Sequence, residues 1–194
     1  MFKHIFVSTV FWAFAICTNQ IHAQVKYEKE SRLKEKDVPS IALDFIDSLA
    51  VKKKVRWYLE EGFNRTSVEA KFKMDNRKYS IEFDTIGNLE DIEIQVKWDG
   101  LNKTLRDSID FYLGQDCEKY KTRRVQIQYS GDPHVLLHKI KTGESKEDCI
   151  TRYEVVVKCC YGNSIDLFEY LFSDSGRKLT VSQIVFKNSS HLEY

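Results

Sequence analysis

The fold is decided by residues 55–96, which read VRWYLEEGFNRTSVEAKFKMDNRKYSIEFDTIGNLEDIEIQV. Apolar and polar residues alternate along this stretch, a pattern typical of strands with one apolar and one polar face. Turn sequences at 61–62, 75–76 and 86–88 divide it into four runs. The apolar positions of the four runs are Val55, Trp57 and Leu59; Val68, Ala70 and Phe72; Tyr79, Ile81 and Phe83; Ile92, Ile94 and Val96. The stretch therefore predicts a four-stranded antiparallel meander.

A helix is expected immediately before the meander, over about 37–50. An apolar stripe recurs there at four-residue spacing, formed by Ile41, Phe45 and Leu49. Asp37 is suited to cap the free backbone N–H groups, and Pro39 falls in the first turn, where its missing N–H costs little. We expect this helix to cover the apolar face of the sheet.

The second half of the chain repeats the order of a helix followed by four strands. A helical stripe is formed by Leu105, Ile109, Tyr112 and Leu113, and strands are expected at 122–129, 152–160, 164–172 and 179–186. The closest internal match aligns Phe83-Asp-Thr-Ile-Gly87 with Phe172-Ser-Asp-Ser-Gly176, each an aromatic strand end followed by a glycine turn. We predict an α+β protein of two tandem units, 24–99 and 100–194, each a helix packed on a four-stranded antiparallel sheet.

The second unit carries an insertion at about 132–142. The pair Asp132-Pro133 is a strong helix start, so a short inserted helix is expected there. The same unit has apolar residues that would face away from its core, namely Val156, Cys160, Ile165, Leu167 and Leu171. A sheet that is apolar on both faces needs a second cover. We expect the inserted helix to supply it, with a partner protein as the alternative.

The first 23 residues have the composition of a secretory signal peptide. They combine Lys3 near the start, an apolar run from Ile5 to Cys17, and a small residue at Ala23. The apolar run is shorter than the ~20 residues that span a bilayer as a helix. We expect cleavage after Ala23, export to the periplasm or the medium, and no membrane insertion after cleavage.

Four cysteines follow this segment: Cys117, Cys149, Cys159 and Cys160. An exported chain meets oxidising conditions, so a disulfide is expected. If 152–160 is one strand, Cys149 and Cys159 lie ~33 Å apart, too far to bridge. Neighbouring Cys159 and Cys160 would point to opposite faces. Spacing does not fix the connectivity; among the open pairings we favour Cys117 with Cys159.

The charge pattern argues against nucleic acid as a partner. Loss of Lys3 leaves 29 basic residues against 29 acidic ones, and the two signs are interspersed. Binding to a phosphate backbone requires a concentrated positive patch, which this sequence does not contain.

No motif for catalysis, metal binding or a cofactor is found. His134 and His138 have the spacing of a metal pair, but Val135 stands where the zinc-protease pattern requires glutamate. Nothing in the sequence indicates a cleft, so the acids Glu69, Asp91 and Glu93 are interpreted as part of a solvated sheet face. We therefore expect no enzyme, no catalytic residue, no metal site and no cofactor.

Several segments together resemble a known family. They are Lys34-Glu-Lys-Asp-Val38-Pro39, Val55-Arg-Trp57-Tyr58, Val68-Glu-Ala70-Lys-Phe72, Tyr79-Ser-Ile81-Glu-Phe83-Asp84 and Gly87-Asn88-Leu89. They resemble the PepSY-like, β-lactamase-inhibitor-like family of exported bacterial proteins. The resemblance implies two copies of a helix on a four-stranded sheet, and inhibition of a secreted enzyme through the open sheet face. It implies no catalytic residue, and the inserted helix and cysteines depart from the family pattern.

The leading hypothesis is a non-catalytic binding protein of the bacterial envelope that presents a sheet face to a protein partner. The polar positions of the first meander would form that face: Arg56, Tyr58, Glu60, Glu69, Lys71, Lys73, Glu82 and Glu93. Tyrosine and arginine are common interface anchors. The alternatives are a plain solvated face, or a small-ligand or ion (calcium) sensor that uses the acidic face or the gap between the units.

Overall fold

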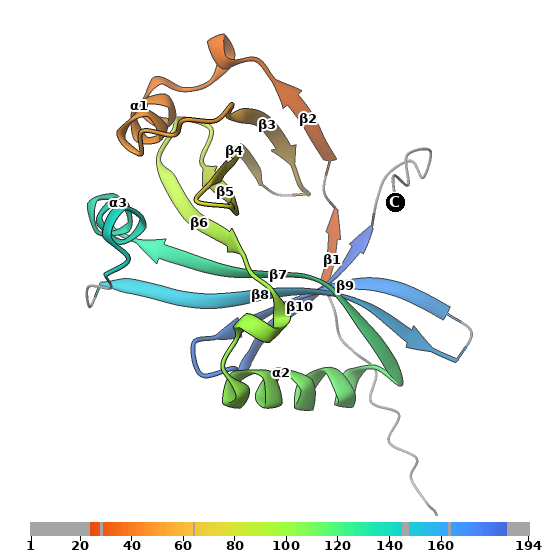
Figure 1. Cartoon of the computed structure of the whole chain (residues 1–194). Helices are drawn as coiled ribbons and strands as arrows, with labels where there is room; N and C mark the ends of the chain where they lie inside the picture. Colours follow the sequence, from red (N-terminus) through yellow and green to blue (C-terminus); the bar gives the residue numbers. More distant parts are fainter. Residues whose placement is uncertain (1–23, 28, 64, 145–147, 163, 186–194) are drawn as a thin grey trace, which may run out of the picture.

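The computed structural model describes residues 24–27, 29–63, 65–144, 148–162 and 164–185. These residues form one ten-stranded sheet with three α-helices against it (Figure 1). Within these ranges no helix has both the length and the apolar character to cross a membrane. The predicted signal peptide and Phe186, the end of the last predicted strand, lie outside the described residues.

The sheet order is β1-β10-β9-β8-β7-β6-β5-β4-β3-β2. The strands are β1 (Gln24–Tyr27), β2 (Lys29–Leu33), β3 (Arg56–Glu61), β4 (Thr66–Met74), β5 (Arg77–Phe83), β6 (Leu89–Gln95), β7 (Lys119–Gly131), β8 (Cys149–Tyr161), β9 (Ser164–Ser173) and β10 (Lys178–Val185). All neighbours are antiparallel except β1 and β10, which are parallel.

The predicted meander of the first half is confirmed. Strands β3 to β6 pair in chain order, and the predicted apolar residues within them share one face. Val55 and Val96 lie just outside the strands, and Val96 packs against the second core instead. The turn between β4 and β5 places both Asp75 and Asn76 at positive φ, 46° and 63°. These values match the tight hairpin turn whose twist fits the flanking strands. Local alternation and turn chemistry were therefore sufficient to predict this part.

The division of the sheet into two separate units is not confirmed. The last strand of the first half pairs with the first strand of the second half, with Ile94 opposite Ile127. An unpaired β6 or β7 edge would leave a row of backbone N–H and C=O groups without partners. Pairing these two edges satisfies both rows and joins the halves into one sheet.

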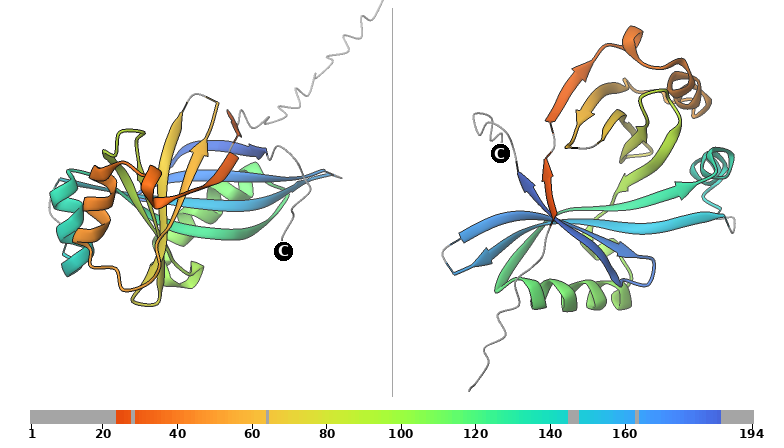
Figure 2. Two further views of the ribbon diagram at one scale, coloured as in Figure 1. Left: turned by 90° about the horizontal axis from the view of Figure 1, so that it is seen from above. Right: turned by 180° about the vertical axis from the view of Figure 1, so that it is seen from behind.

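One segment supplies both end strands of the sheet. β1 and β2 follow each other in the chain, yet β1 pairs with β10 and β2 pairs with β3. The sheet therefore curls until its two ends are linked by this segment (Figures 1 and 2). These strands were not predicted, because 24–33 is highly charged and lacks an alternating apolar face.

Each half has its own apolar core on the outer face of the curled sheet. Helix α1 (Ser40–Ser48) packs on β3–β6, and α2 (Lys103–Asp116) packs on β7–β10. The predicted stripe of α2 is largely confirmed, since Leu105, Ile109 and Leu113 are buried.

The predicted stripe of α1 is confirmed in part, and its predicted cap was wrong. Leu49 is buried and Phe45 packs against the first core, but Ile41 is 53% exposed, and Ala42 and Ile46 are buried instead. Asp37 belongs to a preceding 3₁₀ helix, and the N-cap is Pro39, with no side-chain cap. Apolar residues occur on both sides of this short helix, so four-residue spacing alone did not identify every buried position.

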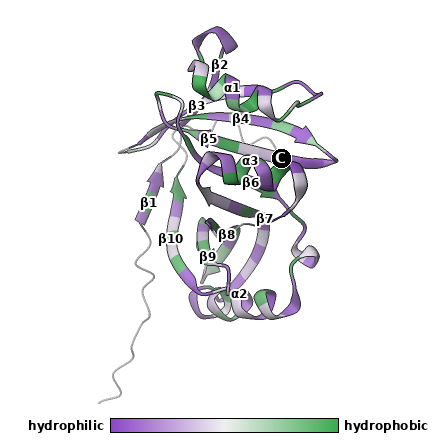
Figure 3. Cartoon of the chain, turned by 90° about the vertical axis from the view of Figure 1, so that its left-hand side faces the viewer, coloured by the Kyte–Doolittle hydropathy of each residue, from purple (hydrophilic) through white to green (hydrophobic). Residues whose placement is uncertain are grey.

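The inserted helix exists but covers a different core from the one expected. Helix α3 (Pro133–Thr142) is capped by Asp132, whose side chain accepts from the backbone N–H groups of His134 and Val135. Its buried residue Leu136 joins α1 and β3–β6 in the first core. Figure 3 looks onto this side, where α1 and α3 both lie against the strands of the first half. The covering role on the second half was therefore wrong.

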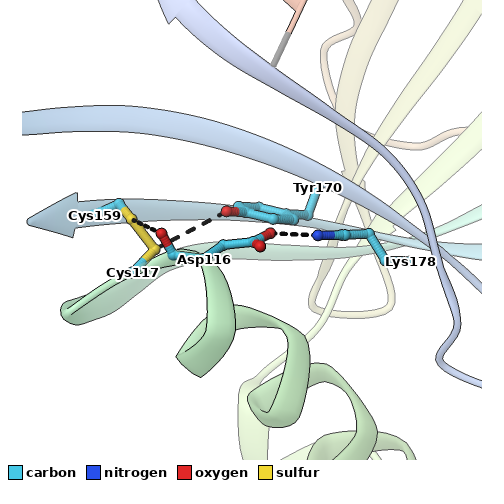
Figure 4. Close-up of a disulfide and its surroundings, with 5 residues drawn as sticks. All are labelled: Asp116, Cys117, Cys159, Tyr170 and Lys178. Atoms are coloured by element: carbon cyan, nitrogen blue, oxygen red, sulfur yellow. Dashed lines mark hydrogen bonds and ion pairs between the residues drawn. A yellow bond between two sulfur atoms is a disulfide. The ribbon is translucent and has the colours of Figure 1, made fainter. Parts of the chain in front are cut away.

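The structure contains a disulfide between Cys117 and Cys159, the pair favoured from the sequence, with Cα atoms 5.5 Å apart (Figure 4). It connects the end of α2 to β8 inside the second core. Beside it, the ammonium of Lys178 contacts the carboxylate of Asp116 at 2.6 Å, and the Tyr170 hydroxyl lies 4.0 Å from the Cys117 sulfur. Cys149 and Cys160 carry free thiols.

Candidate binding site

The inner face of the curled sheet, opposite the two cores, is polar and encloses a pocket. The pocket has a volume of about 410 Å³. Seven of the eight residues predicted as an interaction face line it: Arg56, Glu60, Glu69, Lys71, Lys73, Glu82 and Glu93. The eighth, Tyr58, lies on the same strand face, with the Arg32 guanidinium and the Lys71 ammonium 5.0 and 5.1 Å from its ring centre. The predicted residues are thus brought together, but around a hollow.

The interpretation of this face as solvated was wrong. Glu69 is only 4% exposed and Glu93 only 6%. The reason is the curl of the sheet, which brings strands of the second half over the polar face of the first. Carboxylates that would be hydrated on a flat sheet are largely removed from water, and burial of charge must be offset by partners.

Six lining residues come from outside the first meander and were missed: Lys26, Glu30, Arg124, Gln126, Glu154 and Glu169. A signal for part of this set was present, because Gln126 alternates with apolar neighbours on β7 and Glu154 does so on β8. We expected the corresponding face of the second half to be apolar. It is mixed: Val156 is buried there, but Ile165 is 56% exposed and the charged residues point into the pocket.

Ion pairs cross the pocket wall from strand to strand. The Arg124 guanidinium contacts Glu154 at 2.9 Å, and the Lys26 ammonium contacts Glu169 at 2.6 Å. On the other side, the Lys71 ammonium contacts Glu30 on β2 and also Glu69 on its own strand, the latter at 2.7 Å. Because these groups are partly removed from water, the pairs hold the lining side chains in place more firmly than exposed pairs do.

A row of carboxylates runs across β4, β5 and β6. Glu69 lies directly opposite Glu82, and Glu82 lies directly opposite Asp91. Burial raises the pKa of Glu82, although the guanidinium of Arg65 at 2.7 Å opposes this. Burial, followed by the charge of Glu82, raises the pKa of Asp91 to about 8. Burial and the charge of Glu154 raise the pKa of Glu93 well above its ordinary value. Like charges packed this closely favour the protonated forms.

This row predicts that the protein becomes less stable as pH rises. The folded state keeps the proton of Asp91 up to about pH 8, whereas the unfolded chain releases it near 3.8. The folded state therefore binds the extra proton between these values, and its stabilising effect is lost as pH rises through the window. We expect the free energy of unfolding, measured with a chelator present, to fall by roughly 4 kcal/mol between about pH 5 and pH 9, at about 1.4 kcal/mol for each pH unit below the pKa of Asp91.

Asp91→Asn should reduce this slope by removing the contribution of Asp91, while Glu82 and Glu93, whose pKa values are also raised, keep theirs. Asp99→Asn, at an exposed carboxylate outside the row, should leave the slope unchanged. Urea unfolding at several pH values measures both. A slope of the same size in the Asp91 variant would contradict the assignment.

The comparisons with known proteins concern the fold. No protein-family model and no curated protein matches the chain. A solved DUF2874 family protein from Bacteroides ovatus is similar, with a TM-score of 0.50 at 14% identity, covering 75% of this chain and 87% of that one. A solved BLIP-like protein from Bacteroides fragilis has a TM-score of 0.48 at 15% identity, covering 79% of this chain and 92% of that one. At 14% identity the first likeness shows a shared fold and nothing of function.

Proposed function

We propose that this chain is an exported, non-catalytic binding protein that holds a charged element of a partner protein in the pocket of its curled sheet. The observation that carries the proposal is the convergence of the predicted interaction residues on one hollow of about 410 Å³. Ion pairs preorganise this lining, and preorganised charged groups favour specific recognition and fast association.

The shape and charge of the pocket restrict the partner. A hollow of this volume admits a few side chains of a loop and excludes a flat protein surface. Its lining has seven acidic and six basic side chains, so a complementary loop carries both signs of charge. An inhibitor that captures a loop of a secreted or periplasmic enzyme would use such a site, and we place this protein in that class.

We also infer that the two halves are copies of one unit. Gly87 and Gly176 occupy equivalent turns, each between the third and fourth strand of its half, with φ of 97° and 81°. Each glycine N–H donates to the backbone oxygen of the residue three positions earlier, Asp84 or Ser173. Each glycine also lies against the helix of its own half. Shared contacts of this kind support duplication of a helix-on-four-strands unit.

Replacing both Arg56 and Tyr58 by alanine should weaken partner binding by about 30-fold. This is the effect of losing about 2 kcal/mol at an interface anchor. Arg56 is exposed and Tyr58 half-buried, so the change should leave the fold intact. The tagged chain, expressed with its own N-terminal segment, would be used to capture its partner from the envelope and culture fluid of the source organism.

The matched control is Lys52→Ala with Lys53→Ala, which removes positive charge from exposed positions outside the pocket. It should retain the partner as the wild type does. The proposed function would be rejected if the Arg56→Ala, Tyr58→Ala variant retained the partner as well as the wild type does. It would also be rejected if no eluate contained a stoichiometric partner.

A further inference from the structure

Three carboxylates converge at one point of the inner face. Glu82 on β5 and Asp91 and Glu93 on β6 each place an oxygen within 4.8 Å of the other two. Glu82 and Asp91 are directly opposite across the two strands. Like charges at opposed positions destabilise an antiparallel pair. The arrangement therefore requires either protons on these carboxylates or a cation between the strands.

The cationic side chains nearby are engaged elsewhere. The Arg65 guanidinium contacts Glu82 at 2.7 Å but also Glu90 at 2.5 Å, and its side chain is more than half exposed. The Arg124 guanidinium contacts Glu154. Across the described ranges, no lysine or arginine nitrogen lies within 4.0 Å of a carboxylate oxygen of Asp91 or Glu93. The negative charge at this point is thus only partly offset.

A buried amide oxygen points independently to a missing ligand. Gln126 on β7 is only 5% exposed, and its Nε2 donates to Glu93 Oε2 at 2.5 Å. Its Oε1 has no hydrogen-bond partner within the part of the chain that the structure describes, and neither has Asp91 Oδ1. Buried polar atoms are almost always satisfied by protein, water or an ion, so the orphaned acceptor of Asp91 and that of Gln126, whose amide bonds Glu93, require an explanation.

We propose that Glu82, Asp91, Glu93 and Gln126 bind one calcium ion. All four donors are oxygens, the ligand type that calcium takes, and the three carboxylate oxygens lie within 4.8 Å of one another, so that small side-chain shifts bring them to one ion. The irregular geometry of strand side chains suits calcium, whereas magnesium demands a near-ideal octahedron at about 2.0 Å. Glu82, Glu93 and Gln126 also line the pocket, which gives the ion a route in and leaves room for water ligands.

Bound calcium would offset most of the negative charge of Glu82, Asp91 and Glu93 and offer a partner to the orphaned oxygens of Gln126 and Asp91. The site goes beyond the proposed function, since it requires no partner. A calcium titration contains no partner protein, so its failure leaves the partner proposal intact, and an empty capture experiment leaves the calcium site intact.

The test is calorimetric titration of the chelator-treated protein, expressed with its own N-terminal segment, with calcium chloride. We expect saturable binding with a dissociation constant at or below about 1 mM, and a rise in melting temperature that follows occupancy. Magnesium chloride at equal ionic strength should give neither. Asp91→Asn should weaken binding at least about tenfold by removing one ligand charge.

Two further variants test whether the loss of binding is specific to the proposed site. Gln126→Leu should also weaken binding, and it does so without changing the charge. Asp99→Asn, at an exposed carboxylate outside the site, should bind like the wild type. The readout is the calcium-induced change in each variant, so a shift in basal stability does not obscure it. No saturable binding up to about 10 mM, an equal response to magnesium, or unchanged affinity in both site variants would overturn the proposal.

Discussion

Replacing Cys117 and Cys159 together by alanine should lower the free energy of unfolding by about 4 kcal/mol at 25 °C. The disulfide joins positions 42 residues apart, so it removes considerable loop-closure entropy from the unfolded chain. Both residues are buried, at 4% and 0% exposure, and they lie in the second core among residues of α2, β8 and β9. Urea unfolding followed by tryptophan fluorescence measures the loss.

The chain offers a matched control. Cys149→Ala with Cys160→Ala removes two sulfurs that form no disulfide and are half-buried, so it should change stability far less. A reducing agent should destabilise the wild type and this control by about the amount lost in the Cys117/Cys159 variant. If reduction has no effect on either protein, the disulfide does not contribute as we expect.

Gly87→Ala and Gly176→Ala should each lower the free energy of unfolding by about 3 kcal/mol, combining the cost of positive φ with a steric clash. A Cβ at residue 87 would lie 2.9 Å from the Pro39 Cβ and 3.1 Å from the Ala42 backbone nitrogen. A Cβ at residue 176 would lie 2.8 Å from the Ser108 Cβ. Both additions push a helix away from its sheet.

Gly143→Ala separates the two causes. Gly143 has a φ of 79°, but a Cβ there would have no atom within 4 Å. It should cost only about 1 kcal/mol, the price of positive φ alone. Thermal or urea unfolding of the three variants measures how much the steric clash with the helix adds to the cost of positive φ. Equal losses at all three positions would mean that the helix contacts of Gly87 and Gly176 do not contribute.

The sequence predicted the strands wherever alternation marked two different faces, as it does for Trp57 and Arg56. It predicted the side of a helix less well. In α1 both Ile41 and Ala42 begin apolar stripes, and only contact with the sheet selects the side of Ala42. The strands β1 and β2 were not predicted, because they are held by backbone hydrogen bonds to their neighbours. Such bonds do not require an alternating pattern of apolar side chains.

The residues of the candidate site could likewise be predicted from the sequence only in part. Period-two alternation showed which residues share the polar face, so Glu82 and Glu93 could be grouped from the sequence alone. Whether that face meets water depends on how strongly the sheet twists and curls, which is set by contacts between distant strands. Alternation also marked Gln126 and Glu154 as polar positions of their strands, but that they meet the polar face of the first half follows from the closure and could be seen only in the structure.

The parallel pairing of β1 with β10 has a consequence for how the chain folds. Gln24 lies beside Ser182, so nearly the whole described chain separates the two partners. Contacts of such long range carry the largest loop-closure cost and form late. While the polypeptide is being synthesised, β1 has no partner to join, and both α-helix-covered halves can assemble before it does. We therefore expect the first strand to pair last, a step that links the two ends of the sheet and completes the pocket.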